Sequence, residues 1–307
     1  MKKAIVTGAN GFVGAAVVKE LVKQGVAVTA VIRNESSDLQ RLKEIEGITY
    51  VFCPLNQLKT LPSLLTERDF DLFYHFAWDG AAGEARANTQ LQLQNAQWTV
   101  DAVEVAHELS CKKIVVSGSI MEHETVSACY TQGNAPGIAY VYGSGKLVAH
   151  TMSSCVAAKL GIELVWGKIT NAYGAGEFSP RFINSTIRKV LDGEDPQFTS
   201  GTQNYDFIYI DDVARAFYHL GTEGKSEHHY LIGSGHAKPL KEFILEMKEA
   251  IGQNVNFIFG DVPFTGVNLP LDLFSTEQIT KDTSFSPEIS FHEGILKTAT
   301  WIKEIDV

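Results

Sequence analysis

The chain has 307 residues, 45% of them hydrophobic, and a formal net charge of −10 at pH 7. A chain of this length and composition can bury a large core, and it has room for a nucleotide-binding domain and a smaller lobe. The negative charge argues against nucleic acids and anionic membranes as partners, because both attract positively charged proteins. We therefore expect a small-molecule ligand.

The first half of the chain alternates short β-branched runs with helical patterns. Strands are predicted at residues 3–7, 26–32, 48–52, 70–76, 113–117 and 163–169. Amphipathic stretches predict helices at residues 15–23, 89–109 and 142–160. This alternation is typical of an α/β fold, a Rossmann-type, doubly wound and mainly parallel sheet.

Beyond residue 169 this rhythm ends. Residues 171–176 are predicted to form a loop, followed by helices at 180–191, 240–251 and 294–305 and short strands at 207–210 and 230–232. We infer a smaller C-terminal α/β substrate lobe that interleaves with the sheet domain. The expected cofactor domain is 1–170 with 203–235, and the expected substrate lobe is 171–202 with 236–307.

The cysteines and the N-terminus bear on the compartment. Cys53, Cys111, Cys129 and Cys155 are scattered without the spacing of a metal site, which is typical of reduced thiols. Met1 leads almost directly into a strand-like run, without room for a signal peptide, and no apolar segment approaches transmembrane length. We expect a cytoplasmic protein.

A glycine motif follows the first predicted strand and precedes the first predicted helix. Gly8 allows a sharp turn, Gly11 lets the backbone approach phosphates, and Gly14 lets the helix pack closely on the sheet. A strand, a glycine turn and a helix in this order present backbone N–H groups to a pyrophosphate. The motif predicts a dinucleotide cofactor.

The end of the second predicted strand bears on which dinucleotide binds. Arg33 stands there, where an acid would hydrogen-bond the adenosine ribose and repel a 2′-phosphate. An arginine can pair with that phosphate, so the sequence favours NADP(H). Glu35 could still reach a ribose, and an arginine at a strand end is often only a surface charge, so NAD(H) stays open.

Tyr142 and Lys146 are four residues apart on a predicted helix and project from the same face. The ammonium is expected to lower the pKa of the phenol, and such a tyrosine can exchange a proton with a substrate hydroxyl or ketone. Ser119 follows the strand at 113–117 and could reach the same oxygen. Together with the glycine motif, these residues indicate a site for hydride transfer.

These motifs resemble those of the extended short-chain dehydrogenases/reductases, in particular the NAD(P)-dependent nucleotide-sugar epimerases, dehydratases and reductases. The resemblance covers nearly the whole chain. In the family's order, the matching segments are Thr7 to Gly14, Asp71-x-x-x-His75-x-Ala77, Asn95, Ser117-Gly-Ser119, Pro136, Tyr142-x-x-x-Lys146, Asn171-x-Tyr173-Gly174, Asp206 to Val213 and Tyr230 to Gly235.

The resemblance implies roles for these residues. Tyr142 would be the acid/base, Lys146 would hold the nicotinamide ribose, and Ser119 would hydrogen-bond the reacting oxygen. The helices at 89–109 and 142–160 resemble those that pair in a homodimer interface. The expected cofactor contacts are Gly8, Asn10, Gly11, Phe12, Val13, Gly14, Arg33, Leu55, Ala77, Ser117, Tyr142 and Lys146; the expected substrate contacts are Ser119, Asn171, Trp78 and Arg181.

The chain also departs from the family's pattern. Ile120 and Met121 stand where the 4,6-dehydratases carry Asp and Glu, so the second acid/base pair that water elimination requires is missing. Tyr205 and Asn268 stand in place of arginines that clamp a diphosphate, and Arg181 is one candidate to replace them.

Three other features have plainer interpretations. Glu122-His123-Glu124 offers metal-ligand side chains, but adjacent residues rarely converge on one ion, so we expect a solvated loop and no metal. His228-His229 precedes a strand and is expected to be structural. Trp78 either lines the substrate pocket or fills the core.

The sequence therefore predicts an NAD(P)-dependent oxidoreductase that acts on a nucleotide-activated sugar. Reduction of a 4-keto-sugar nucleotide with NADPH is the first choice. An epimerase that retains its cofactor is the alternative. A non-catalytic NADP-responsive binding protein is a third hypothesis, which the joint presence of Ser119, Tyr142 and Lys146 argues against.

Overall fold

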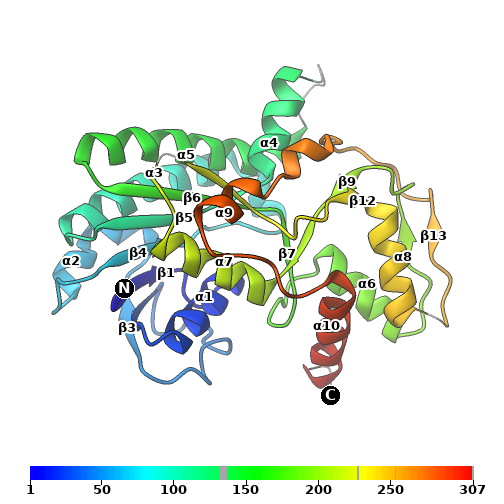
Figure 1. Ribbon diagram of the computed structural model, residues 1–307, viewed down its shortest axis with the longest axis horizontal. Coiled ribbons are helices and arrows are strands. Elements are labelled where there is room, and N and C mark those ends of the chain that lie inside the picture. Colours follow the sequence, from blue (N-terminus) through cyan, green and yellow to red (C-terminus); the bar gives the residue numbers. More distant parts are fainter. Residues whose placement is uncertain (132–136, 227, 253, 306–307) are drawn as a thin grey trace.

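A computed structural model describes residues 1–131, 137–226, 228–252 and 254–305. Its centre is a seven-stranded sheet in the order β11-β6-β5-β4-β1-β2-β3, with every neighbouring pair parallel (Figure 1). The strands are β1 (Lys3–Thr7), β2 (Ala27–Ile32), β3 (Ile48–Phe52), β4 (Leu72–His75), β5 (Lys113–Ser119), β6 (Glu163–Ile169) and β11 (His229–Ile232).

The register of the sheet aligns the carboxyl ends of its central strands. Thr7 at the end of β1 lies opposite Val31 of β2 and His75 of β4. The strand order reverses direction between β1 and β4, and ligands of open parallel sheets bind at the carboxyl edge beside such a reversal. The glycine turn follows β1 at this point.

Helices cover both faces of the sheet, which is why its strands are almost continuously apolar. On one face, α1 (Phe12–Lys23) and α7 (Ile210–Thr222) share a core cluster with buried residues such as Val6 and Tyr74. On the other, α3 (Thr89–Glu108) and α5 (Val141–Leu160) pack over Ile5 and Val116. Figure 1 shows the sheet between these two layers.

The second lobe lies to the right in Figure 1. Its helices are α6 (Phe182–Leu191), α8 (Leu240–Ile251) and α10 (Phe291–Ile305). Its strand pairs are β7 (Asn171–Tyr173) with β10 (Phe207–Tyr209), β9 (Asn204–Tyr205) with β12 (Lys238–Pro239), and β8 (Gln197–Phe198) with β13 (Ile258–Phe259). Phe207, Phe243 and Phe291 form its aromatic centre, with ring centroids 4.9–5.5 Å apart.

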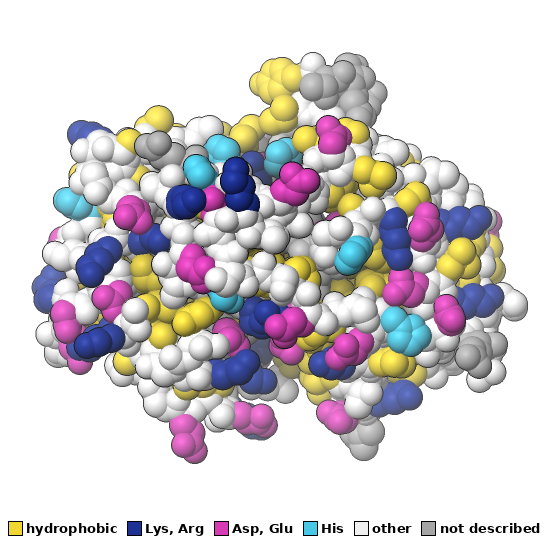
Figure 2. All heavy atoms as spheres, viewed as in Figure 1, with side chains coloured by type: hydrophobic (Ala, Val, Ile, Leu, Met, Phe, Trp, Pro, Cys, Tyr) yellow, Lys and Arg dark blue, Asp and Glu magenta, His cyan; other side chains and the backbone are white. Residues whose placement is uncertain are grey.

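Short elements join these layers. They are α2 (Leu61–Leu64), α4 (Met121–Val126) and α9 (Glu277–Asp282), together with the single turns η1 (Leu55–Thr60), η2 (Glu84–Ala87), η3 (Ser127–Thr131), η4 (Ile138–Tyr140) and η5 (Leu271–Phe274). None of the helices in the described ranges is both long and apolar enough to cross a membrane. On the face drawn in Figure 2, acidic and basic side chains are interspersed.

The predicted fold class is confirmed, and two local predictions are wrong. Residues 171–176 do not all form a loop, because Asn171–Tyr173 pairs with Phe207–Tyr209 as a parallel ladder. The stretch Glu122-His123-Glu124 is not a solvated loop: it belongs to α4, and Glu122 is only 1% exposed because it contacts β5, β6 and α5. The proposed domain boundaries stay a prediction.

Candidate active site

The turn after β1 requires glycine at two of its three glycine positions. Gly8 has φ +66°, and a Cβ there would lie 2.6 Å from the backbone nitrogen of Ala77. A Cβ on Gly14 would collide with the carbonyl oxygen of Gly8. The turn is closed by a hydrogen bond from Gly11 N–H to Gly8 O (3.0 Å), and α1 begins directly after Gly11. The N-terminus of α1 therefore opens at the carboxyl edge of the sheet.

A cavity of about 230 Å³ extends from this turn along the ends of β2 and β3. It is lined by Thr7, Gly8, Asn10, Gly11, Val31, Arg33, Cys53, Leu55, Leu58, Phe76, Ala77, Trp78 and Asp79. Six of the predicted cofactor contacts line this cavity, namely Gly8, Asn10, Gly11, Arg33, Leu55 and Ala77. Arg33 Nη2 is 3.2 Å from Asp79 Oδ1, so this guanidinium already has an acidic partner, and Glu35 does not line the cavity.

A second cavity of about 250 Å³ continues from the first, with which it shares Gly8, Gly11, Phe76 and Trp78. Its walls bring together Phe12, Val13 and Gly14 from α1, Ser117 and Ser119 from β5, Tyr142 and Lys146 from α5, and Arg181. The two cavities form one trough along the edge of the sheet. The glycine turn, the N-terminus of α1 and the apolar slot at Leu55 fit a dinucleotide laid along this trough.

Lys146 and Trp78 form one wall of the second cavity. Lys146 is 3% exposed; its ammonium donates to the carbonyl oxygen of Ser117 (2.9 Å) and lies 3.8 Å from the centroid of the Trp78 ring. Burial lowers the pKa of Lys146 to about 7, while the charge of Glu122 opposes this change. Trp78 donates to Gln92 Oε1 (2.7 Å), and it both lines the cavity and packs against the core beneath α3 and α5.

The expected direction of the pKa of Tyr142 is wrong. Burial raises the pKa of this phenol, whereas Arg86, Arg181 and a hydrogen bond with Ser119 act to lower it. Lys146 is not among the main groups that shift the pKa of Tyr142, because its ammonium is turned toward Ser117 and Trp78. Tyr142 is therefore a protonated acid at neutral pH.

A third cavity, of about 360 Å³, opens between the trough and the second lobe. It shares Ala81, Ala172, Glu177 and Arg181 with the second cavity. Its other lining residues are Ala82, Gly83, Arg86, Asn171, Tyr173, Ser179, Pro180, Phe182, Ile183, Asn184, Tyr205 and Phe207. The predicted substrate residues Asn171 and Arg181 thus lie on the path from the trough into this cavity.

The polar side chains of the third cavity differ in how they are engaged. Arg181 Nε pairs with Glu177 Oε2 (3.1 Å), and the amide of Asn171 donates to the carbonyl oxygen of Asp206 (2.9 Å). Asn268 Oδ1 accepts from the backbone N–H of Asn204 (2.8 Å), which gives this residue a structural contact. Pro136, another residue of the family pattern, lies outside the described residues.

Sequence reasoning missed Arg86 in η2. Its guanidinium carbon lies 4.5 Å from the centroid of the Tyr142 ring. No pattern links a single arginine in a connecting turn to a tyrosine 56 positions later, although Arg86 is the only basic residue between β4 and α3. Only the fold brings the two together.

Next to Ser119, the buried Glu122 forms a polar cluster with His150, Trp166 and Lys168, none of which lines the three cavities. Its Oε1 accepts from Ser119 N–H (2.9 Å) and Trp166 Nε1 (3.0 Å), and its Oε2 lies 3.0 Å from His150 Nδ1 and 3.7 Å from Lys168 Nζ. Burial acts to raise the pKa of Glu122, but His150 and Lys168 bring it below its ordinary value. Neither this cluster nor any other group within the described ranges could hold a metal ion.

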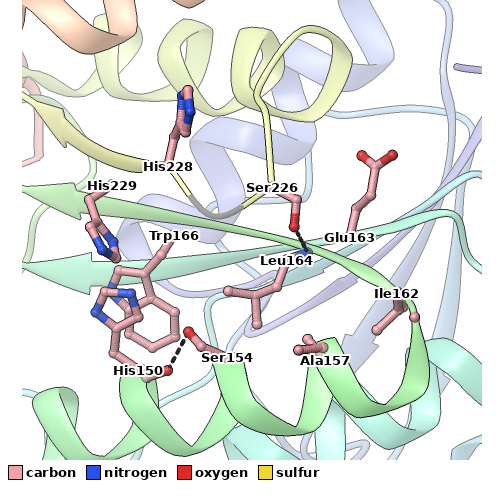
Figure 3. Close-up of a pocket in the computed structure, with 12 residues that line it drawn as sticks. His150, Ser154, Ala157, Ile162, Glu163, Leu164, Trp166, Ser226, His228 and His229 are labelled. Carbon is pink, nitrogen blue, oxygen red and sulfur yellow. Dashed lines mark hydrogen bonds between the residues drawn. The ribbon is translucent and has the colours of Figure 1, made fainter.

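A separate pocket of about 300 Å³ lies beyond this cluster (Figure 3). The His150 ring stacks on Trp166, with centroids 4.4 Å apart, and His229 faces them from β11. His228 Nδ1 lies 2.6 Å from Asp282 Oδ2, which agrees with a structural role for this histidine. The pocket shares no lining residue with the three cavities of the candidate site.

The chain matches the model of the NAD-dependent epimerase/dehydratase family over residues 4–233. It is 22% identical to an Escherichia coli dTDP-glucose 4,6-dehydratase, over 97% of this chain and 92% of that protein. It is 26% identical to the UDP-glucuronate 4-epimerase of Thermodesulfobacterium geofontis, over 98% of this chain and 96% of the epimerase. It is also 24% identical to an E. coli dTDP-4-dehydro-6-deoxyglucose reductase, over 95% of both chains.

Among solved structures, the fold is similar to that of the Bordetella bronchiseptica enzyme WbmF in complex with NAD+. The TM-score is 0.78 at 22% identity, and the match covers 99% of this chain and 93% of WbmF. At this identity the likeness establishes the fold.

Proposed function

Because this chain belongs to the NAD-dependent epimerase/dehydratase family, we propose that it reduces the keto group of a 4-keto-sugar nucleotide. The observation that carries this proposal is the meeting of Ser119, Tyr142 and Lys146 at the point where the trough joins the third cavity. Bound in the trough, the nicotinamide cofactor would supply the hydride. The residues around it would handle the proton and position the substrate.

A protonated Tyr142 can serve as the proton donor of a reduction. Reduction of a ketone needs a proton donor beside the oxygen, and a phenol with a raised pKa keeps its proton at neutral pH. Ser119 would hydrogen-bond the same oxygen, since its hydroxyl is within hydrogen-bonding reach of Tyr142. Lys146, beside both, would bind the ribose next to the nicotinamide.

For the cofactor we propose NADP(H), with NAD(H) as the alternative. The glycine turn would hold the pyrophosphate, and Leu55 and Ala77 would pack on the adenosine half. Arg33 lines the adenosine end of the trough and could pair with a 2′-phosphate. Asp79 competes for this guanidinium, and WbmF binds NAD+, so the preference should be small.

For the substrate we propose that Asn171, Trp78 and Arg181 contact the nucleotide sugar as it crosses from the third cavity to Tyr142. Neither Ile120 nor Met121 lines any of the three cavities, and Glu122 belongs to its own cluster, so these three positions supply no second acid/base pair for a dehydratase. We also propose a homodimer formed through α3 and α5. Leu93 and Met152 on these helices are 59% and 48% exposed, and sedimentation would measure the assembly.

Epimerisation is the second candidate, favoured by the similarity to a UDP-glucuronate 4-epimerase. An epimerase oxidises and then reduces the same carbon, so it retains its cofactor and consumes none. The two candidates separate in one assay with sugar nucleotides and keto-sugar nucleotides. Net oxidation of NADPH supports the reductase, whereas purified protein that carries oxidised cofactor and shows no net consumption supports the epimerase.

Replacement of Tyr142 by Phe tests the enzymatic reading in both cases. We expect Tyr142→Phe to lower kcat by at least about 100-fold, because the positioned proton donor is lost. Cofactor affinity should remain that of the unmodified protein, as measured by calorimetry. The matched control is Tyr130→Phe, since Tyr130 is 81% exposed and lines none of the three cavities. Full activity in the Tyr142 variant would refute the proposal.

A further inference from the structure

Among the described residues of the candidate site, Arg86 is the one basic group without a polar partner. Within the described part of the chain, its guanidinium forms no hydrogen bond or ion pair, and its Nε is fully buried without a partner. Its guanidinium lies over the face of the Tyr142 ring, with 4.5 Å between the guanidinium carbon and the ring centroid. The other basic groups of the site are engaged: Arg181 with Glu177, and Lys146 with Ser117.

Arg86 forms no ion pair with a described acidic residue, including Glu124. The charge of Arg86 acts on the partly buried Glu124, but the two do not come within ion-pair distance. A stacked aromatic ring recovers only about 0.5–2 kcal/mol, whereas a buried polar group without a hydrogen bond costs about 1–3 kcal/mol. Arg86 is partly exposed and only its Nε is fully buried, so this cost falls on one donor, which stacking on Tyr142 does not replace. A ligand that enters the cavity would supply the missing partner.

The third cavity is where such a ligand would lie, because Arg86 lines it together with Asn171 and Tyr205. A guanidinium presents a planar fork of donors that matches a carboxylate or a phosphate. Both are present in acidic nucleotide sugars, so the contact chemistry alone does not separate them. The position of Arg86 does: it lies against Tyr142, whose hydroxyl must touch the reacting oxygen, so its partner belongs near the reacting carbon.

We propose that Arg86 binds a carboxylate on the sugar ring, and hence that the substrate is a nucleotide-linked sugar acid. This inference rests on the proposed function, since it takes Tyr142 as the residue that contacts the reacting oxygen. The carboxylate would replace the missing partner of Arg86. It would also fix which face of the sugar is presented to Tyr142.

Binding measurements in a variant that does not turn over isolate this contact. In Tyr142→Phe protein saturated with NAD+, calorimetry would compare a UDP-hexuronic acid with the matching neutral UDP-hexose. Adding Arg86→Gln should weaken binding of the hexuronic acid by about 10- to 100-fold and leave the hexose unchanged. Arg86→Lys, which keeps the charge but loses the fork, should give an intermediate loss. Unchanged NAD+ affinity would show that the variants are folded.

The matched control is Lys241→Gln. Lys241 also lies over an aromatic ring, 5.0 Å from the centroid of Phe259, but it lines none of the cavities. The Lys241→Gln variant should bind the UDP-hexuronic acid and the UDP-hexose with the same affinities as its parent protein. An equal loss for both sugars in Arg86→Gln would place Arg86 at the diphosphate and overturn the assignment, as would no loss for either. If the parent protein binds neither nucleotide while binding NAD+, it is the proposed function that fails.

Discussion

Glu122 and Glu124 are two residues apart on α4, yet they occupy opposite kinds of environment. Glu122 points into the cluster next to Ser119, where it has two N–H donors, His150 and Lys168 as partners. The carboxyl group of Glu124 feels the charge of Arg86 but has no hydrogen bond or ion pair to any described residue. Burial raises the pKa of Glu124 to about 7, whereas the pKa of Glu122 lies below its ordinary value.

This difference distinguishes a charge whose partners all lie within the protein from a charge that lacks such partners. A buried carboxylate with a complete set of partners holds elements together, and here it joins β5, β6 and α5. A buried charge without partners destabilises the native state. Such charges are tolerated where function needs them. Arg86 lines the third cavity, and its charge acts on the carboxyl group of Glu124.

Removal of Glu122 should have the largest effect on stability. Glu122→Ala leaves the buried Lys168 and the indole N–H of Trp166 without their partner, and breaking a buried charge pair in this way costs about 3–5 kcal/mol. Urea unfolding followed by circular dichroism would measure the loss. The control is Glu122→Gln, which still accepts from Ser119 N–H and Trp166 and should lose less. A loss below about 1 kcal/mol in the alanine variant would contradict a structural role.

Replacement of Glu124 should stabilise the protein, and the gain in free energy of unfolding should depend on pH. The native pKa of Glu124, about 7, exceeds the value of 4.5 expected when unfolded, so the native state holds a proton that the unfolded state has released between these values. Stability from this residue is therefore lost as pH rises from 4.5 through 7. Glu124→Gln should raise the free energy of unfolding by about 2 kcal/mol near pH 8 and by little near pH 5.

The matched control for this prediction is Glu122→Gln on the same helix. It should destabilise the protein near pH 8, where Glu124→Gln stabilises it. If Glu124→Gln has the same effect at both pH values, Glu124 ionises normally in the native state. The contrast between the two carboxylates would then be lost.

The elements that could be predicted from the sequence are those with a local pattern. The order of strand, glycine turn and helix at Gly8 to Gly14 depends only on neighbouring residues, as does the helical spacing of Tyr142 and Lys146. The structure places both at one trough. Most strand and helix limits agree within a few residues for the same reason, because each has its own apolar period.

The parts that failed are those decided by tertiary contacts. The six residues of α4 are too few to show a period, and Glu122 is buried only because Trp166 and His150 meet it from other elements. The pKa of Tyr142 depends on burial and on Arg86, which the chain brings from a distant turn. The pairing of Asn171–Tyr173 likewise needs Phe207–Tyr209, more than thirty residues later.

Arg33 and Asp79 give an intermediate case, a charge that has a partner but lies at the surface. Their side chains are 63% and 43% exposed, so the pair contributes only about 0–1 kcal/mol and a ligand can compete for the guanidinium. Asp79→Asn should free Arg33 while keeping an oxygen for Gly80 N–H. We expect it to raise the ratio of NADP+ to NAD+ affinity by about two- to fivefold, measured by calorimetry. Arg33→Gln should lower the same ratio. If neither variant changes it, Arg33 is an ordinary surface charge, and the 2′-phosphate argument for NADP fails.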